Sequence, residues 1–153
     1  MTQQLSVSDL QTHLGYWLRA VSNAVSQSFA RKVEAEGVTV AEWVFLRVLY
    51  EGEDIAPSLL AERMGMTKGA ISKLADRLLE KGHIKRHANA QDGRAHTLSL
   101  TPAARTLVPR LAAIADRNDA EFFGGLMATE QAQLRTLLQK IALQHELMTT
   151  PID

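Results

Sequence analysis

The stretch RMGMTKGAISKLADRLLEKG, residues 63–82, combines two patterns in one segment. Ile71, Leu74 and Leu78 recur at intervals of three and four residues, which predicts a helix with one buried face. Thr67 can cap the start of this helix. Cationic and short residues lie between the apolar ones, namely Lys68, Gly69, Ser72, Lys73 and Arg77. The segment therefore predicts a helix whose exposed face is small at its start and positively charged further along.

A shorter helix is predicted immediately before it, in PSLLAERM, because Pro57 is well tolerated in a first helical turn. Gly65 ends that helix in a turn, and Ala61 lets the two helices cross closely. Gly82 can end the longer helix in a left-handed conformation. Two helices joined by a glycine turn are typical of a helix-turn-helix unit, whose second helix enters a DNA major groove. A plain helical hairpin in a core has the same apolar spacing, so this pattern alone leaves the function open.

An alternating pattern follows the two helices. HIKRHAN and RAHTLSL flank AQDG, and the pair Asp92-Gly93 favours a tight turn, so a two-stranded hairpin is predicted. Its cationic side chains could enter a minor groove, and they are Lys85, Arg86, His87 and Arg94. A hairpin in this place is a wing. Helix-turn-helix and wing in one continuous stretch together predict DNA binding.

The distribution of charge supports this prediction. The chain of 153 residues has 17 Lys and Arg against 17 Asp and Glu, and a net charge of zero taken alone argues against a nucleic-acid partner. Residues 63–105, however, contain nine Lys and Arg against three acids, so this segment carries +6 and the remainder −6. Such asymmetry is expected of a protein that meets a polyanion with one side, although a solvated face without a partner would also produce it.

Further helices are predicted on both sides of this segment. Ser8-Asp9 could cap a first helix, and Thr39 and Glu42 fit a capping box that begins a second. Thr101-Pro102 reads as the cap and first residue of another helix, which Pro109 should kink or split. Thr129 could cap a last helix.

The outer helices indicate a homodimer. Residues 39–101 form a small winged-helix lobe, and the helices at 9–36 and 103–148 carry longer apolar stripes than that lobe can cover. The stripes could pack on each other within one chain, but we favour a second copy of the chain as the partner. Two-fold symmetry would then place two DNA-contacting helices about 34 Å apart, one turn of DNA.

Several functional classes are disfavoured. The chain has no cysteine, no secretory signal and no apolar run near the roughly 20 residues that span a bilayer, so we expect a cytoplasmic protein without a membrane partner. No nucleophile–base pair, glycine-rich phosphate loop or pair of acids suggests an enzyme. His83, His87 and His96 gather near the hairpin without supporting ligands, so neither a metal nor a cofactor is expected.

The run LAERMGMTKGAISKLADRLLEKGHIKR and the wing DGRAHTLSLT resemble the MarR (multiple antibiotic resistance regulator) family of transcriptional regulators. The family pattern of Asp-x-Arg followed by Leu-x-Leu-Thr is present at Asp92, Arg94, Leu98, Leu100 and Thr101, although Ala95 stands where the family often has a charged residue. The resemblance implies that residues 1–153 form a single MarR-type domain, mainly α-helical with a small β-hairpin. It further implies an obligate homodimer that binds a palindromic operator, usually to repress transcription.

Two sets of site residues follow. The predicted DNA contacts are Thr67, Lys68, Gly69, Ser72, Lys73, Arg77, Arg86, His87, Asp92 and Arg94. The resemblance implies that Asp92 orients Arg94 and that Arg94 probes the minor groove. The candidate effector-binding residues, suited to an aromatic carboxylate, are His13, Trp17, Arg19, Trp43 and Arg47. Two alternatives stay open: core tryptophans with surface arginines in place of an effector pocket, and a winged-helix module for protein–protein contact in place of an operator-binding protein.

Overall fold

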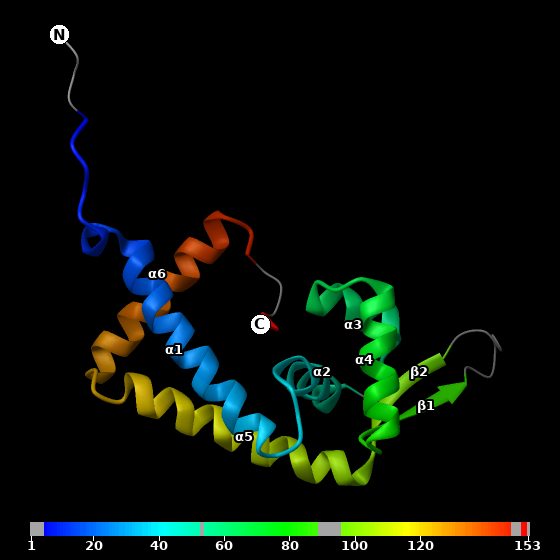
Figure 1. The fold of residues 1–153 in the computed structure, drawn as a ribbon. Coiled ribbons are helices and arrows are strands. Elements are labelled where there is room, and N and C mark those ends of the chain that lie inside the picture. Colours follow the sequence, from blue (N-terminus) through cyan, green and yellow to red (C-terminus); the bar gives the residue numbers. More distant parts are fainter. Residues whose placement is uncertain (1–4, 53, 89–95, 148–150, 153) are drawn as a thin grey trace.

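The computed structural model describes residues 5–52, 54–88, 96–147 and 151–152. In chain order the elements are η1 (Leu10–Thr12), α1 (Leu14–Glu34), α2 (Val40–Glu51), α3 (Pro57–Met64), α4 (Lys68–Glu80), β1 (Ile84–Ala88), β2 (His96–Leu100), α5 (Pro102–Phe123) and α6 (Ala128–Gln144). Helix α5 is a long strut with α1 packed along it; α2, α3, α4 and the hairpin gather toward one end and α6 leaves from the other (Figure 1). The predicted fold class, mainly helical with one small hairpin, is confirmed.

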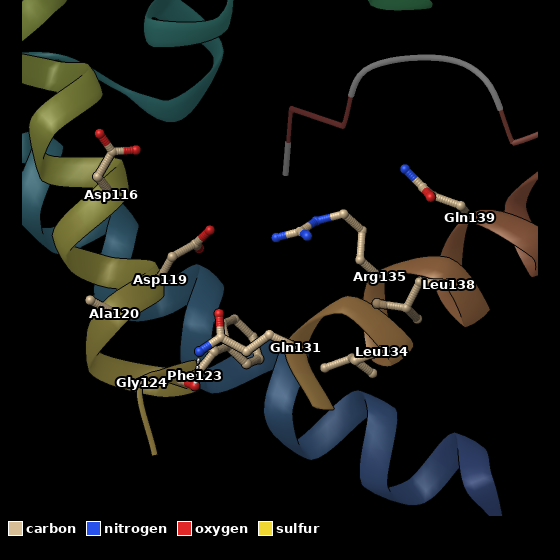
Figure 2. Close-up of a pocket in the computed structure, with 10 residues that line it drawn as sticks. All are labelled: Asp116, Asp119, Ala120, Phe123, Gly124, Gln131, Leu134, Arg135, Leu138 and Gln139. Atoms are coloured by element: carbon tan, nitrogen blue, oxygen red, sulfur yellow. Dashed lines mark hydrogen bonds between the residues drawn. The ribbon is translucent and has the colours of Figure 1, made fainter. Parts of the chain in front are cut away.

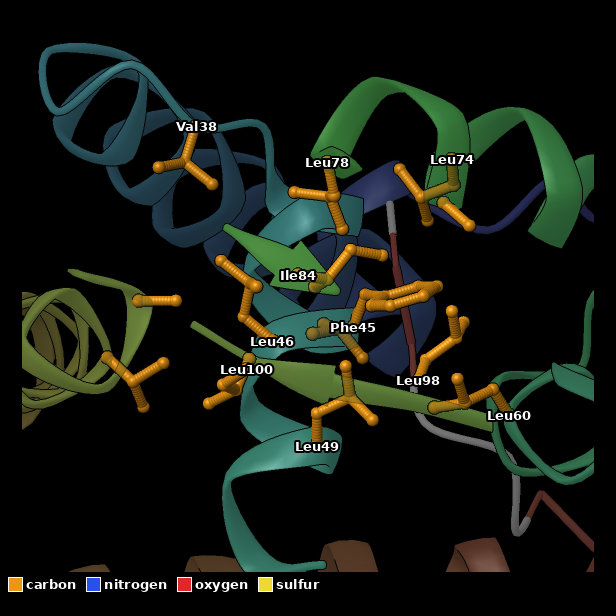
Figure 3. Packing of buried hydrophobic residues seen from close by; sticks show 14 of the residues in the cluster. Val38, Phe45, Leu46, Leu49, Leu60, Leu74, Leu78, Ile84, Leu98 and Leu100 are labelled. Carbon is orange, nitrogen blue, oxygen red and sulfur yellow. The ribbon is translucent and has the colours of Figure 1, made fainter. Parts of the chain in front are cut away.

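One core of buried apolar side chains extends through α2, α3, α4 and the hairpin, within residues 39–101, which we call the winged-helix lobe, and continues into α5 and the end of α1. Phe45, Leu46 and Leu49 of α2 are completely buried at its centre. Apolar side chains of α3, α4 and the hairpin close around them (Figure 3), and these are Leu60, Met64, Ile71, Leu74, Leu78, Ile84, Leu98 and Leu100. Each large apolar side chain buried in this way contributes about 1.5–3 kcal/mol. The core therefore fixes the backs of α4 and of the hairpin.

Most of the predicted helix boundaries are confirmed. The Thr39 hydroxyl accepts a hydrogen bond from the amide of Glu42 at 3.1 Å, and the Glu42 carboxylate accepts one from the amide of Thr39 at 3.1 Å. The Thr67 hydroxyl accepts from the amide of Ala70 at the start of α4. Gly65 and Gly82 have φ values of 62° and 74°, a left-handed conformation that glycine adopts without strain.

The hairpin pairs β1 and β2 antiparallel, with Ile84 opposite Leu100 and Ala88 opposite His96. Its tip, residues 89–95, lies outside the described residues. A further bridge joins Ile55 to Leu98 through two backbone hydrogen bonds of 2.9 and 2.8 Å. The sequence analysis did not anticipate this bridge, which ties the segment before α3 to the wing.

Two predicted helix starts are wrong. Among the described residues, no side-chain cap precedes the first helix: Asp9 begins the short turn η1, and α1 starts at Leu14. The last helix starts at Ala128, because the Glu130 carboxylate accepts a hydrogen bond from the amide of Met127 at 2.9 Å. Of the two outcomes predicted at Pro109, a kink or a split, the split does not occur: α5 is one helix through Pro109, since a proline removes a single intrahelical hydrogen bond and the rest of the helix remains packed.

Candidate nucleic-acid interface

Helix α4 has two distinct faces. With 3.6 residues per turn, its buried residues Ile71, Leu74, Ala75 and Leu78 fall within an arc of about 100°. The predicted DNA contacts of this helix fall on the remaining arc and are exposed, namely Lys68, Gly69, Ser72, Lys73 and Arg77. The structure therefore brings these five residues together on one solvent-facing surface of the lobe, which we call the α4 face.

The cations of the α4 face are available to a ligand. Within the described part of the chain, no carboxylate lies within salt-bridge distance of Lys68, Lys73 or Arg77. A Cβ atom at Gly69 would meet no neighbouring atom within 4 Å, so packing within the chain does not require glycine there. Close approach of a second molecule to the backbone would require it. The Thr67 hydroxyl, by contrast, is engaged in capping α4.

The wing strand is connected to α4 through an ion pair. Arg86 Nη2 lies 3.6 Å from Asp76 Oδ1, and both side chains are largely exposed. An exposed pair of this kind contributes at most about 1 kcal/mol, so it orients Arg86 without fixing it. Asp76 was not predicted as part of the site; its position in the middle of the cationic arc of α4 was the signal that could have found it.

The ring of His87 faces its own chain. Its Nε2 atom lies 2.8 Å from the Ser99 hydroxyl oxygen on β2 and 3.6 Å from Asp54 Oδ1. One ring nitrogen of His87 is therefore engaged within the chain, and the expected contact of this residue with DNA stays a prediction. Asp92 and Arg94, the two wing residues carried over from the family pattern, lie outside the described residues.

The five candidate effector residues do not meet within one chain. Trp17 is 51% exposed, and its Nε1 donates a hydrogen bond to the backbone oxygen of Gln11 at 2.8 Å. Trp43 instead packs edge-on against Phe29, with ring centroids 6.4 Å apart. Phe29 is twelve residues beyond Trp17 on α1, a separation of about 18 Å along the helix. The predicted single pocket is thus divided into two groups.

The charged effector candidates are divided between α1 and α2 in the same way. Arg47 pairs with Glu51 one turn further along α2, at 2.9 Å, and its guanidinium lies 5.8 Å from the centre of the Tyr50 ring. His13 and Arg19 are exposed just before and within the first two turns of α1, whereas Arg47 lies on α2. Arg47 thus has an acidic partner on its own helix, and its part in effector binding stays a prediction.

Two of the hollows among the described residues lie between secondary-structure elements. One, of about 510 Å³, opens in the angle between α5 and α6, with Phe123 and Gln131 near its apex and Arg135 facing Asp119 across it (Figure 2). The other, of about 410 Å³, continues the α4 face toward the wing. It is lined by Ala56, Pro57, Ser58, Lys68, Ile71, Ser72 and His96. The α4 face, this hollow and β2 thus form one continuous surface.

The part of the chain that the structure describes contains no group of three His, Asp or Glu side chains placed to hold a metal ion. Among the same residues, the helices lack the combination of length and hydropathy that crossing a bilayer requires.

Comparisons of the sequence with known proteins identify related proteins. A sequence model described as MarR family matches residues 36–95. A protein of Thauera aromatica, whose name assigns it to regulation of the hcr operon, is 31% identical over 132 residues, covering 86% of this chain and 80% of that protein. The chain belongs to the MarR family.

Solved structures of MarR-family fold agree with the architecture described above. The DNA complex of MepR from Staphylococcus aureus has a TM-score of 0.76 and 25% identity, over 86% of this chain and 98% of that chain. CouR from Rhodococcus jostii, solved with p-coumaroyl-CoA bound, has a TM-score of 0.75 and 26% identity, over 89% and 96% of the two chains. This MarR-family chain is accordingly a transcriptional regulator built on a winged helix.

Proposed function

We propose that this MarR-family chain acts as a homodimer that binds a palindromic DNA operator and represses transcription from it. The observation that carries the proposal is the α4 face, where Lys68, Lys73 and Arg77 have no carboxylate partner among the described residues. Lysine and arginine on an exposed helix bind phosphates and the O6 and N7 edge of guanine. No catalytic step is part of the proposed function, and we assign it to the cytoplasm.

Individual roles follow from position. Lys73 and Arg77 lie furthest along the α4 face and are assigned to base edges and flanking phosphates. Lys68 and the backbone amides near Thr67 and Gly69 are assigned to a phosphate at the start of α4, where the helix dipole favours an anion.

The wing supplies the remaining DNA contacts of the proposal. Arg94, oriented by Asp92, is assigned to the minor groove, in keeping with the family pattern. Arg86 and His87 on β1 are assigned to the same wing contact; Asp76 orients Arg86, and Ser99 engages one ring nitrogen of His87.

The proposal of a homodimer rests on uncovered apolar surface. None of the described residues of α6 is buried, although the helix exposes Leu134, Leu137, Leu138 and Ile141. The beginning of the chain likewise exposes Leu10, Leu14, Trp17, Leu18 and Val21. Contiguous apolar surface of this kind on a soluble protein marks an interface. A second copy, related by a two-fold axis, would cover both helices and fill the hollow between α5 and α6.

Regulation by a small aromatic or anionic effector is the last part of the proposal. CouR, a neighbour in structure, was solved with p-coumaroyl-CoA bound. In this chain we assign His13, Trp17 and Arg19 to the dimer surface, and Trp43 with Arg47 to the junction between α1 and the lobe. An effector bound at either place would change operator affinity by favouring one spacing of the two α4 helices.

The test is a titration of fluorescently labelled duplexes, measured by anisotropy, with DNA flanking the protein's own gene and a scrambled duplex of equal length. We expect binding of the flanking DNA to exceed that of the scrambled duplex by at least about 1,000-fold. The logarithm of affinity should fall linearly with the logarithm of salt concentration. Equal affinity for both duplexes, or affinity independent of salt, would contradict operator binding and favour a module for protein–protein contact.

A further inference from the structure

The carboxyl end of α4 is fastened to the corner between α1 and α2. Lys81, the residue that follows α4, donates hydrogen bonds to both carboxylate oxygens of Glu42, at 3.0 and 2.8 Å. It also donates to the backbone oxygen of Gly37 at 3.0 Å. Gly37 lies in the turn that ends α1, and Glu42 lies in the first turn of α2.

The next two residues are fastened to the start of α5. The Thr101 hydroxyl donates a hydrogen bond to the backbone oxygen of Gly82 at 2.7 Å, and the Thr101 amide donates to the backbone oxygen of His83 at 3.0 Å. Thr101 is also the cap of α5, since its hydroxyl accepts from the amide of Ala104. Residues 81–83 are therefore bonded to both places where the dimerisation helices enter the lobe.

The carboxylate of Glu42 depends on Lys81. Its side chain is 1% exposed, whereas that of Lys81 is 39% exposed. Burial by itself raises the pKa of the Glu42 carboxyl, but the hydrogen bonds and charge of Lys81, together with the hydrogen bonds from Thr39, more than offset this and lower the pKa below its ordinary value. A buried carboxylate that lost its cation would be strongly unfavourable, so the two groups stay together in the folded protein.

Lys81 has no hydrogen left for DNA. A lysine ammonium has three donors, and Glu42 Oε1, Glu42 Oε2 and the Gly37 oxygen take all three. Lys81 thereby differs from Lys68 and Lys73, whose charges have no carboxylate partner among the described residues. Its positive charge is paired with the buried carboxylate of Glu42.

We infer that Lys81 and Glu42 are positioning residues for DNA recognition: their ion pair sets the angle of α4 relative to the dimerisation helices. The inference rests on the proposed function. Because the operator presents two half-sites at fixed spacing, a loosened α4 would lose affinity for the operator, while attraction to phosphates in general would remain.

The experiment compares Lys81→Met with Lys73→Met, which serves as the matched control on the α4 face. Three quantities are measured: affinity for the operator, affinity for a scrambled duplex, and the salt dependence of operator binding. Lys81→Met should lower operator affinity about tenfold, with scrambled binding and the salt slope unchanged. Lys73→Met should lower both affinities and reduce the salt slope by about 0.9, the loss of one phosphate contact.

A second substitution tests the pair. Glu42→Gln keeps an oxygen for the Thr39 cap but removes the charge, and it should lower operator affinity in the same selective way. In the Lys81→Met background Glu42→Gln should cost nothing further, because the two residues act as one unit. Circular dichroism and the mass of the dimer report whether each variant is folded; should Lys81→Met not fold, Glu42→Gln provides the same comparison.

The outcomes are distinguishable. A wild-type protein that ignores every duplex overturns the proposed function and the inference together. If wild-type protein binds the operator but the folded variants bind it equally well, the inference alone is overturned. A reduced salt slope in Lys81→Met, like that of Lys73→Met, would also overturn it, because Lys81 would then be a phosphate contact.

Discussion

The winged-helix lobe differs from α6 and the beginning of α1 in how far its apolar side chains are exposed. In the lobe, Leu46, Leu74 and Leu98 are at most 1% exposed. On α6, Leu137 is 58% and Ile141 is 49% exposed. The residue types are the same, so the difference lies in what covers them.

This contrast separates two sources of stability. The apolar side chains of the lobe are buried by other elements of the same chain. Helix caps and the bridge between Ile55 and Leu98 provide hydrogen bonds to its backbone groups. Helix α6 and the first half of α1 are regular helices, but their large apolar side chains remain exposed. We therefore expect each chain to contact DNA through its own lobe, and the spacing of the two contacts to depend on how two chains pair.

The largest expected effect comes from charge on the uncovered surface. Leu137→Glu combined with Ile141→Glu would place two carboxylates in the proposed interface, where an unpaired charge is very costly to bury. We expect dissociation to single chains and a loss of operator affinity of more than about 1,000-fold, measured by sedimentation and by anisotropy.

The matched control is Thr136→Glu, on the polar side of the same helix. It should leave both the dimer and operator binding close to wild type. An unchanged dimer in the double variant would contradict the assignment of α6 to the interface.

The second effect concerns the lobe core. Leu74→Ala removes a buried side chain between α4 and α2 and should lower the free energy of unfolding by about 2–5 kcal/mol, measured by urea denaturation. Leu137→Ala, the same change on α6, should weaken the dimer without shifting the unfolding of the lobe. Equal effects of the two truncations on lobe unfolding would mean that the two regions are not energetically distinct.

A third substitution acts on DNA contact alone. Lys73→Ala should reduce operator affinity by about 1–3 kcal/mol, roughly fivefold to 150-fold, because it removes one contact of the α4 face. Since Lys73 is exposed and makes no ion pair within the described residues, stability should stay within about 0.5 kcal/mol of wild type. Loss of the fold together with loss of binding would show that Lys73 has a structural role.

The smallest effect is a pH dependence of stability at Glu42. Because the pKa of Glu42 is lowered in the folded protein, its ion pair stabilises the fold fully above the ordinary glutamate pKa of about 4.3, and this stabilisation is lost as pH falls through the lowered pKa. Glu42→Gln should therefore be less stable than wild type at pH 7, and the difference should shrink as pH falls below about 4. A difference independent of pH, measured from urea midpoints, would contradict the role of the charge.

The sequence predicted those features that depend on local chemistry. The capping box at Thr39 and Glu42, the turn glycines Gly65 and Gly82, and the two faces of α4 all follow from neighbours within a few residues. The start of α1 was wrong because Ser8 and Asp9 are good capping residues in general, and the chain nevertheless forms a short turn there before the helix begins.

Features that depend on distant neighbours escaped the sequence analysis. The pairs Arg86–Asp76 and Lys81–Glu42 join residues that lie ten and 39 positions apart, and no local pattern specifies them. The division of the effector candidates between Trp17 and Trp43 is of the same kind. Both tryptophans follow helical spacing, but only the packing of α1 on α2 shows which part of α1 faces Trp43.

The most direct test of the account is the mass of the protein, free at micromolar concentration and bound to one operator duplex, measured by sedimentation velocity. We expect two chains in both states. In the proposed homodimer each chain covers the α6 and the beginning of α1 of the other, and one operator binds two α4 helices. A single chain free in solution, or one chain bound per operator, would contradict it.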